Sequence, residues 1–308
     1  MDSRTCHSHG ELRIVEFPDH DATLIEGVHG RWIRIEESPE VVMAGHHKVN
    51  GGSFVKRDFW VTTFGQVLRV NLQTETCETL WTAPFLNDLH FVGCFSDRMV
   101  VVNTGLERIE ILNAADHTNH SWINLLDHID ESKEFDQSLD YRHVWSTQPH
   151  LVHANHCFSF DGEIWVTRFC QQDALGLDSG RRIDLSPWGN PHDGCVQDDE
   201  VFFTTTNGHL VSYSSTRVKF RSWDLNRIIG ADQLGWCRGL AIEGDLAFIA
   251  FTQFRPSLTK EMGKWILQGG SQDRHPTCIV KLDMGKEKIL AKYHFIERDL
   301  TIYGIYRI

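Results

Sequence analysis

The chain lacks the features by which several protein classes are recognised. It has no run of clustered Lys and Arg, and its formal net charge is -12 at pH 7. Nucleic-acid and anionic-membrane partners are therefore disfavoured, because they are held by grouped basic side chains. No apolar run approaches the ~18 residues of a membrane-spanning helix, and the N-terminus has no apolar core of a secretory signal. We expect a cytoplasmic protein that binds neither nucleic acid nor membrane.

Motifs that carry common chemistries are missing as well. The 8 cysteines are spread out without a C-x-x-C pair, which disfavours zinc and thioredoxin chemistry and fits a reducing compartment. G-x-S-x-G, G-x-x-x-x-G-K-[ST] and G-x-G-x-x-G are also absent, which removes the usual signals of serine hydrolases, P-loop proteins and dinucleotide binding. Cys237, within GWCRG, is expected to be a small buried residue and not a nucleophile.

What the chain has is a repeat of short β-like runs. Each repeat spans roughly 40–50 residues and holds four runs, which is typical of a β-propeller blade. In the third repeat, the dipeptide Asp161-Gly162 predicts a tight turn between the first run and the second. The apolar second runs that align the five repeats are FWVTTFG from Phe59, MVVVNTG from Met99, IWVTRFC from Ile164, VFFTTTN from Val201 and AFIAFTQ from Ala247.

The number of blades depends on how the two ends of the chain are used. Three N-terminal runs (Leu12–Phe17, Ala22–Glu26 and Arg31–Glu37) and one C-terminal run (Thr301–Ile308) remain outside the five repeats. We predict an all-β propeller of six four-stranded blades, closed by the C-terminal strand pairing with the N-terminal strands, because closure leaves no open sheet edge. The alternative is five blades, with the N-terminal runs packed outside the ring.

Residues 1–308 are expected to form a single propeller domain. Two insertions interrupt the pattern, at 126–148 and at 254–276. In a four-stranded meander, the link into the first strand and the link from the second strand to the third emerge on the same face. Both insertions should therefore lie over one face, as the wall or lid of a pocket.

One register of the repeats carries a polar residue each time. Eleven positions before the apolar centre of each second run stand Asn50, His90, Asn155, His192 and Arg238. We call these five residues the axial column. The first strand of each blade lines the central channel of a propeller, so we expect the axial column to form a ring at one mouth. Lys48, His153 and Trp236 should lie just outside the ring, with Tyr303 as a sixth member.

These residue types suggest binding and catalysis. His90, His153 and His192 come from three successive repeats and could ligate one divalent metal, Zn, Fe or Ca. Catalytic roles are assigned to Asp193, Arg238 and Tyr303, with Arg238 binding a substrate carboxylate or phosphate. Substrate contacts are assigned to Asn50, Lys48, Asn155 and Trp236. The alternative is that these polar side chains bond turn backbone in a wet channel and bind no metal.

Parts of the repeats resemble a known family. DGEIWVT at 161–167, DGCVQDDEVFFTTTNGHLVSY at 193–213 and the repeat after His90 look like the six-bladed propellers of the SMP-30/gluconolactonase and NHL-type superfamily, over residues 45–255. The resemblance implies a propeller related to calcium- or zinc-dependent lactonases, strictosidine-synthase-like enzymes or pure binding modules. In the lactonases an acidic residue, an Asn and an Asp surround the metal. Asn155 and Asp193 stand at suggestive positions here, without the Glu and with His90 and His192 added.

Two functions follow from the sequence. The first is an enzyme that binds a small polar substrate at the axial mouth, through a His-ligated metal, with hydrolase, lyase or oxygenase chemistry. The second is a non-catalytic propeller that binds a peptide or protein partner on its upper face.

Overall fold

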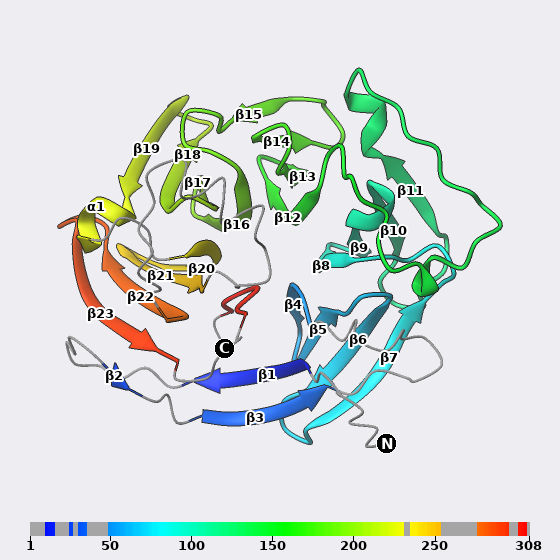
Figure 1. Cartoon of the computed structure of the whole chain (residues 1–308), viewed down its shortest axis with the longest axis horizontal. Helices are drawn as coiled ribbons and strands as arrows, with labels where there is room; N and C mark the ends of the chain where they lie inside the picture. The colour runs from blue at the N-terminus through cyan, green and yellow to red at the C-terminus, as the bar shows by residue number, and fades with distance from the viewer. Residues whose placement is uncertain are drawn as a thin grey trace, which may run out of the picture.

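The computed structural model describes residues 10–15, 25–26, 30–35, 49–230, 235–253, 276–295 and 301–306. Within these ranges the chain forms five blades of four antiparallel strands each around a common axis, and one short parallel strand extends the fifth blade (Figure 1). This is the propeller predicted from the repeats. Each sheet is a meander of consecutive strands whose first strand is innermost. Among the described residues, no helix combines the length and apolar character needed to cross a bilayer.

The strands follow the predicted repeats closely. The first three blades comprise β4 (Gly52–Val55), β5 (Asp58–Thr62), β6 (Gln66–Asn71) and β7 (Thr76–Thr82); β8 (Leu89–Phe95), β9 (Arg98–Asn103), β10 (Arg108–Asn113) and β11 (Ser121–Asn124); and β12 (Ala154–Phe160), β13 (Glu163–Arg168), β14 (Asp173–Gly176) and β15 (Arg182–Asp184). The last two comprise β16 (Pro191–Gln197), β17 (Glu200–Thr205), β18 (His209–Ser214) and β19 (Lys219–Asp224); and β20 (Trp236–Glu243), β21 (Leu246–Thr252), β22 (Cys278–Asp283) and β23 (Lys288–His294).

The turn between the first two strands is built alike in all five blades. Its first residue has a positive φ each time, which matches the right-handed twist of a two-residue hairpin. The third blade has the predicted Asp161-Gly162 turn, with φ of 52° and 81°. The corresponding first turn residues in the other blades are Lys56, Ser96, Asp198 and Gly244.

The register inferred from the repeats is confirmed by strand pairing. The centre of each second strand pairs with the residue two positions after the axial column: Val61 with Gly52, Val101 with Val92, Val166 with Cys157, Phe203 with Gly194 and Ile249 with Leu240. In four blades the pairing shifts at the axial column residue itself. Such a β-bulge re-aims a side chain, so it turns the column residues out of the regular alternation.

Apolar side chains fill the spaces between neighbouring blades. Trp60 and Val67 of the first blade pack with Val92 and Met99 of the second, all of them buried. Similar clusters join the second blade to the third and the fourth to the fifth. Burial of an apolar side chain stabilises by about 1.5–3 kcal/mol, so these layers hold the blades in place around the axis.

The described residues form five four-stranded blades, which confirms the alternative count given above in place of six blades. β1 (Gly10–Val15) and β3 (Gly30–Ile35) form a separate two-stranded sheet, and β2 (Ile25–Glu26) pairs in parallel with β23. Residues 301–306 are not a strand. They lie near the axis (Figure 1), and Thr252 Oγ1 accepts the Ile302 N–H at 3.1 Å. The Thr252 side chain, and not the backbone of a neighbouring strand, therefore binds this segment.

The C-terminal segment nevertheless completes the ring between the fifth blade and the first. Ile302 and Ile305 pack against Ala250 and Ile279 of the fifth blade. Tyr306 packs its ring on Phe59 of the first blade, with 4.8 Å between ring centroids. The segment thus packs between the fifth and first blades without forming a strand.

The two predicted insertions fall differently with respect to the described residues. Residues 126–148 contain no strand and include the short 3-10 turns η2 (Leu125–His128) and η3 (Tyr141–His143). Asn87 Nδ2 donates to the carbonyls of Tyr141 and Val144, so the insertion lies against the link that leads into the second blade. The insertion at 254–276 lies almost wholly outside the described residues.

Candidate functional site

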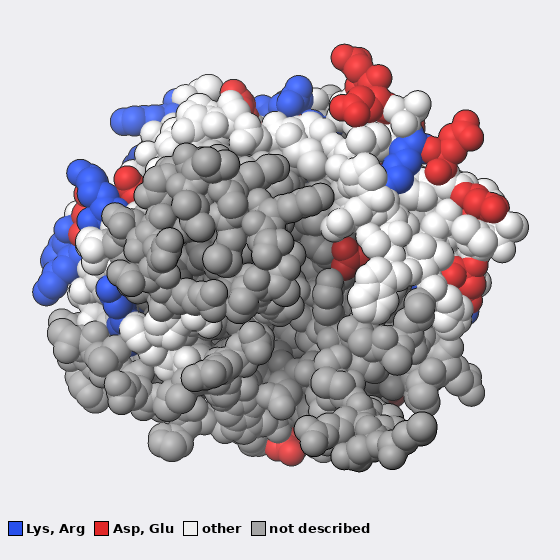
Figure 2. Space-filling model, viewed as in Figure 1, with Lys and Arg blue, Asp and Glu red and all other residues white. Residues whose placement is uncertain are grey.

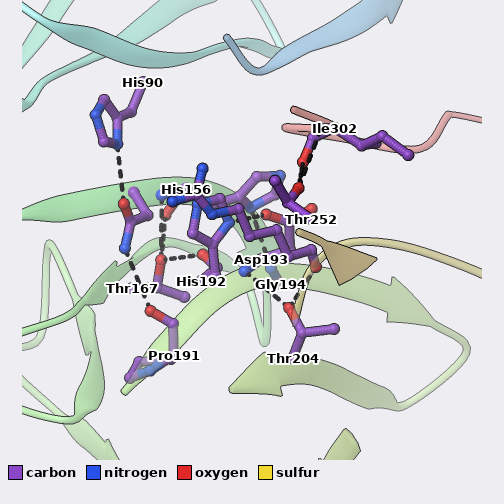
Figure 3. A network of polar contacts seen from close by, with 12 residues as sticks. His90, His156, Thr167, Pro191, His192, Asp193, Gly194, Thr204, Thr252 and Ile302 are labelled. Atoms are coloured by element: carbon purple, nitrogen blue, oxygen red, sulfur yellow. Dashed lines mark hydrogen bonds and ion pairs between the residues drawn. The ribbon is translucent and has the colours of Figure 1, made fainter. Parts of the chain in front are cut away.

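The axial column forms a ring of adjacent residues. His90 Nδ1 lies 2.9 Å from Asn155 Oδ1, and Asn155 Nδ2 donates to the carbonyl of Pro191, next to His192 (Figure 3). Asn50 Nδ2 donates to the carbonyl of Leu89, next to His90. Contacts therefore link the inner strands of four successive blades, as predicted from the shared register.

The fifth column residue and the C-terminal segment close this ring. The Arg238 guanidinium carbon lies 5.1 Å from the centroid of the Tyr303 ring. Three residues later, the Tyr306 hydroxyl accepts the backbone N–H of Gly52 at 2.8 Å. Tyr303 therefore stands beside Arg238 as predicted, whereas the contact with the first blade belongs to Tyr306, which the sequence reasoning missed. The sequence feature that could have indicated Tyr306 was its position in the same β-like run as Tyr303.

His192 and Asp193 form a hydrogen-bonded pair at the centre of the site. Their Nδ1 and Oδ1 atoms are 2.6 Å apart, and both residues are buried. Burial, with the positive charge of Arg238 and the nearby His90, keeps the pKa of His192 well below its ordinary value of 6.5. The imidazole is therefore neutral at physiological pH, and the pair is a neutral ring beside a carboxyl group.

Asp193 is a buried carboxyl group whose pKa is shifted toward neutrality. Burial raises its pKa from 3.8 to about 6, although His156, a backbone hydrogen bond from Leu240 and Arg238 all favour the charged form. Desolvation thus outweighs the nearby positive charge. A carboxyl group that titrates near neutrality, next to a neutral histidine, is typical of sites that transfer protons.

The predicted metal ligands are only partly grouped. The His90 and His153 rings are 5.1 Å apart, and His153 Nδ1 lies 2.8 Å from His150 Nδ1. The Nδ1 atoms of His90 and His192 are engaged with Asn155 and Asp193. Within the described ranges, no three His, Cys, Asp or Glu side chains are grouped as metal ligands. His90, His153 and His192 are not grouped around one point in this structure, and a metal bound by them stays a prediction.

The other assigned residues are placed as follows. Asn50 and Asn155 are buried and bond backbone carbonyls, which agrees with the alternative that such residues hold strand ends. Trp236 lies beside Arg238, with 5.8 Å from its ring to the guanidinium carbon. Lys48 lies outside the described residues. Cys237 is fully buried, and burial raises its thiol pKa.

Buried threonines on the second strands connect the blades, and the sequence reasoning did not identify them. Thr167 Oγ1 donates to the carbonyl of His192 at 2.8 Å, and Thr204 Oγ1 donates to that of Arg238 at 2.6 Å. Each hydroxyl thus holds the column residue of the next blade. The repeated Thr in VTRF and FTTT was the available signal.

Replacing Thr204 by valine is expected to lower the free energy of unfolding by about 1–3 kcal/mol. The hydroxyl also accepts the Asp193 N–H at 3.3 Å, so two buried backbone groups would lose their partner at nearly constant side-chain volume. Urea denaturation measures the change. Thr216→Val, at an exposed position, serves as the control and should change stability by less than about 0.5 kcal/mol. Equal effects of the two substitutions would contradict this role.

A surface groove of about 460 Å³ lies elsewhere, between the fourth and fifth blades. Its lining includes Asp198, Arg217, Gly244 and Gly285, which belong to the turns after the first and third strands of each blade. These turns emerge on the face opposite the start of the axial column. The groove is therefore separate from the ring.

Comparisons with known proteins agree on the architecture. No protein-family model matches the chain, and no curated protein matches it in sequence. A structure of the nidogen/laminin complex aligns with a TM-score of 0.55 and 11% identity, covering 86% of this chain and 84% of that one. The fold is that of a β-propeller.

Virginiamycin B lyase from Staphylococcus aureus is a second similar propeller. Its catalytically inactive His-to-Ala variant with quinupristin aligns with a TM-score of 0.53 and 11% identity, covering 84% of this chain and 74% of that one. The selenomethionine-substituted lyase gives 0.51 and 12%, covering 85% and 89%. At these identities the likeness establishes the fold alone, and it does not establish the SMP-30/gluconolactonase type.

Proposed function

We propose that this propeller is an enzyme that binds a small polar substrate at the axial ring and moves a proton with the His192–Asp193 pair. The observation that carries the proposal is the buried 2.6 Å contact between a neutral imidazole and a carboxyl group whose pKa is raised to about 6. Hydrolysis and elimination both need such proton transfer, and one of the similar propellers is a lyase.

The tautomer of His192 follows from the charge of its neighbour. Above pH 6 the Asp193 carboxylate accepts the Nδ1–H of His192, which leaves the lone pair on Nε2. His192 then acts as the general base, and Asp193 holds the ring and stabilises the imidazolium that forms. The His192 side chain is buried but keeps 10% of its surface exposed.

His192 also has a defined surrounding that limits the substrate. His90 of the second blade and Arg238 of the fifth both influence its pKa, so groups from three blades lie close together here. On the face viewed in Figure 2, acidic side chains gather over the 126–148 insertion and basic ones at the opposite rim near β19. We therefore assign recognition to the axial residues and not to a broad charged surface.

His192→Gln is expected to reduce turnover by about 10²–10⁴-fold, because glutamine supplies no base. A panel of lactones, esters and substrates prone to β-elimination, followed by proton release and absorbance, measures this. His209→Gln, in the third strand β18 of the same blade, is the matched control and should keep full activity. Turnover that His192→Gln leaves unchanged would contradict the proposal.

Partner binding on the upper face is the second candidate function. In the 126–148 insertion, Trp145 and Leu139 expose 57% and 46% of their surface, and large exposed apolar side chains are typical of interaction sites. One similar propeller was determined in a complex of nidogen with laminin. This candidate differs from the first because it predicts no turnover of any substrate in the panel.

A further inference from the structure

We infer that the molecule bound at the axial ring carries a carboxylate or another small oxyanion, and that Arg238 binds it. This inference rests on the proposed use of the ring as a substrate site. It adds the chemical class of the substrate. It is carried by the surroundings of the Arg238 guanidinium, which differ from those of the other enclosed arginines.

The backbone of Arg238 is held firmly at the ring. It lies in the β-bulge of β20, and its carbonyl accepts the Thr204 hydroxyl at 2.6 Å. Its guanidinium lies 5.8 Å from the Trp236 ring and 5.1 Å from the Tyr303 ring. Aromatic rings stabilise a nearby cation, more strongly where water is excluded, but they accept no N–H···O hydrogen bond from it.

The hydrogen-bonding capacity of Arg238 is incompletely used within the described part of the chain. Its Nε is buried and has no hydrogen-bond partner there, and no carboxylate of these residues lies within ion-pair distance. Asp193 acts on it only through space. A buried donor without a partner costs free energy, so a polar ligand that accepts from this Nε–H would recover it.

Other enclosed arginines in the chain show what Arg238 lacks. Arg168 is paired with Asp173 at 2.7 Å, Arg108 with Glu110 at 2.5 Å and Arg142 with Asp140 at 2.6 Å. Each of these cations has a carboxylate from its own blade or loop. Arg238 has no such carboxylate among the described residues, and a ligand could supply it, because the guanidinium fork fits a carboxylate or phosphate through two parallel hydrogen bonds.

The position of Arg238 also suits the proton-transfer pair. Its charge is among the causes that lower the pKa of His192.

The test follows the Nε–H resonance of Arg238 by ¹H–¹⁵N NMR of the full chain, assigned through Arg238→Lys. Sodium benzoate, its neutral analogue benzamide and inorganic phosphate are the probes. We expect a saturable downfield shift with benzoate and none with benzamide. Phosphate as the tighter of the two anions would indicate a phosphorylated substrate. The resonance of exposed Arg227, which bridges to Glu287, should stay in place as the control.

Affinity for benzoate, measured by calorimetry, is expected to fall about tenfold or more in Arg238→Lys, because an ammonium group cannot reproduce the two parallel hydrogen bonds of the guanidinium fork. An unchanged melting temperature shows that the variant is folded. No saturable shift with either anion, or an equal response to benzamide, would overturn the inference. Anion binding without turnover would instead overturn the proposed enzyme function, so the two failures are distinguishable.

Discussion

Replacing Asp193 by asparagine is expected to lower turnover by about 10²–10⁴-fold. The new side chain would present an amide to His192 Nδ1, which is 2.6 Å from the carboxylate in the native pair. The amide N–H₂ is a donor, so the imidazole would turn to the tautomer with its proton on Nε2 and lose the base. Steady-state kinetics on the same substrate panel, with Asp198→Asn in an exposed turn as the control, measure the loss.

The pH profile separates this role from a purely structural one. Because the pKa of Asp193 is raised to about 6, the wild-type rate should fall about tenfold per pH unit below pH 6. Below that value the protonated carboxyl group donates to Nδ1 and removes the base. Asp193→Asn should show low activity without this fall of the rate below pH 6. If the fall persists in the variant, it is caused by the titration of another group.

The same shift predicts a stability change with a defined sign. The pKa of Asp193 is higher in the folded chain, about 6, than its ordinary value of 3.8, so the folded state binds its proton more tightly. The stabilisation is fully present below pH 3.8, is lost as pH rises toward 6, and amounts to about 3 kcal/mol. Wild type minus Asp193→Asn, measured by urea denaturation across this window, should show that decline.

Replacing Arg168 by methionine is expected to destabilise the fold by about 3–5 kcal/mol. Arg168 and Asp173 are each 1% exposed, and the guanidinium donates to both carboxylate oxygens, at 2.8 and 2.7 Å. Removing the cation leaves a buried carboxylate whose remaining ion-pair partner among the described residues is the half-exposed Arg182. Equilibrium urea denaturation measures the loss.

Two further variants test whether the expected loss of stability comes from burial of the Arg168–Asp173 ion pair. Glu287→Gln breaks the exposed pair with Arg227 and should cost less than about 1 kcal/mol. Arg168→Met combined with Asp173→Leu removes both charges and should recover most of the loss, because no uncompensated charge remains buried. A double variant as unstable as the single one would mean that the packing of Arg168, and not its charge, matters.

The repeats were predictable because their causes are local. Short continuous apolar runs define the second strands, and Asp161-Gly162 defines a hairpin turn; both are properties of a few consecutive residues. The shared register then predicted the axial column, and the pairing of Val166 with Cys157 and of Phe203 with Gly194 confirms it. The bulges within these strands were not predictable, because they depend on how blades meet at the axis.

Glu107 illustrates a contact that no local pattern reveals. Its buried carboxylate accepts the backbone N–H groups of Leu151, Val152 and His153, more than forty positions away. The residue lies in a turn with a φ of 56° and carries no repeat signal. It nevertheless holds the strand start that places His153 beside His90.

The sequence by itself determined the all-β repeat, the blade register and the set of polar residues that meet at the axis, because hydrophobic periodicity and turn chemistry act over a few residues. Only the tertiary structure decided that five blades are complete, that the C-terminal segment closes the ring through Tyr303 and Tyr306, and that His192 and Asp193 form a pair while Arg238 has no carboxylate partner within the described residues. These outcomes depend on burial and on distances between segments far apart in the chain, and burial is what raises the pKa of Asp193.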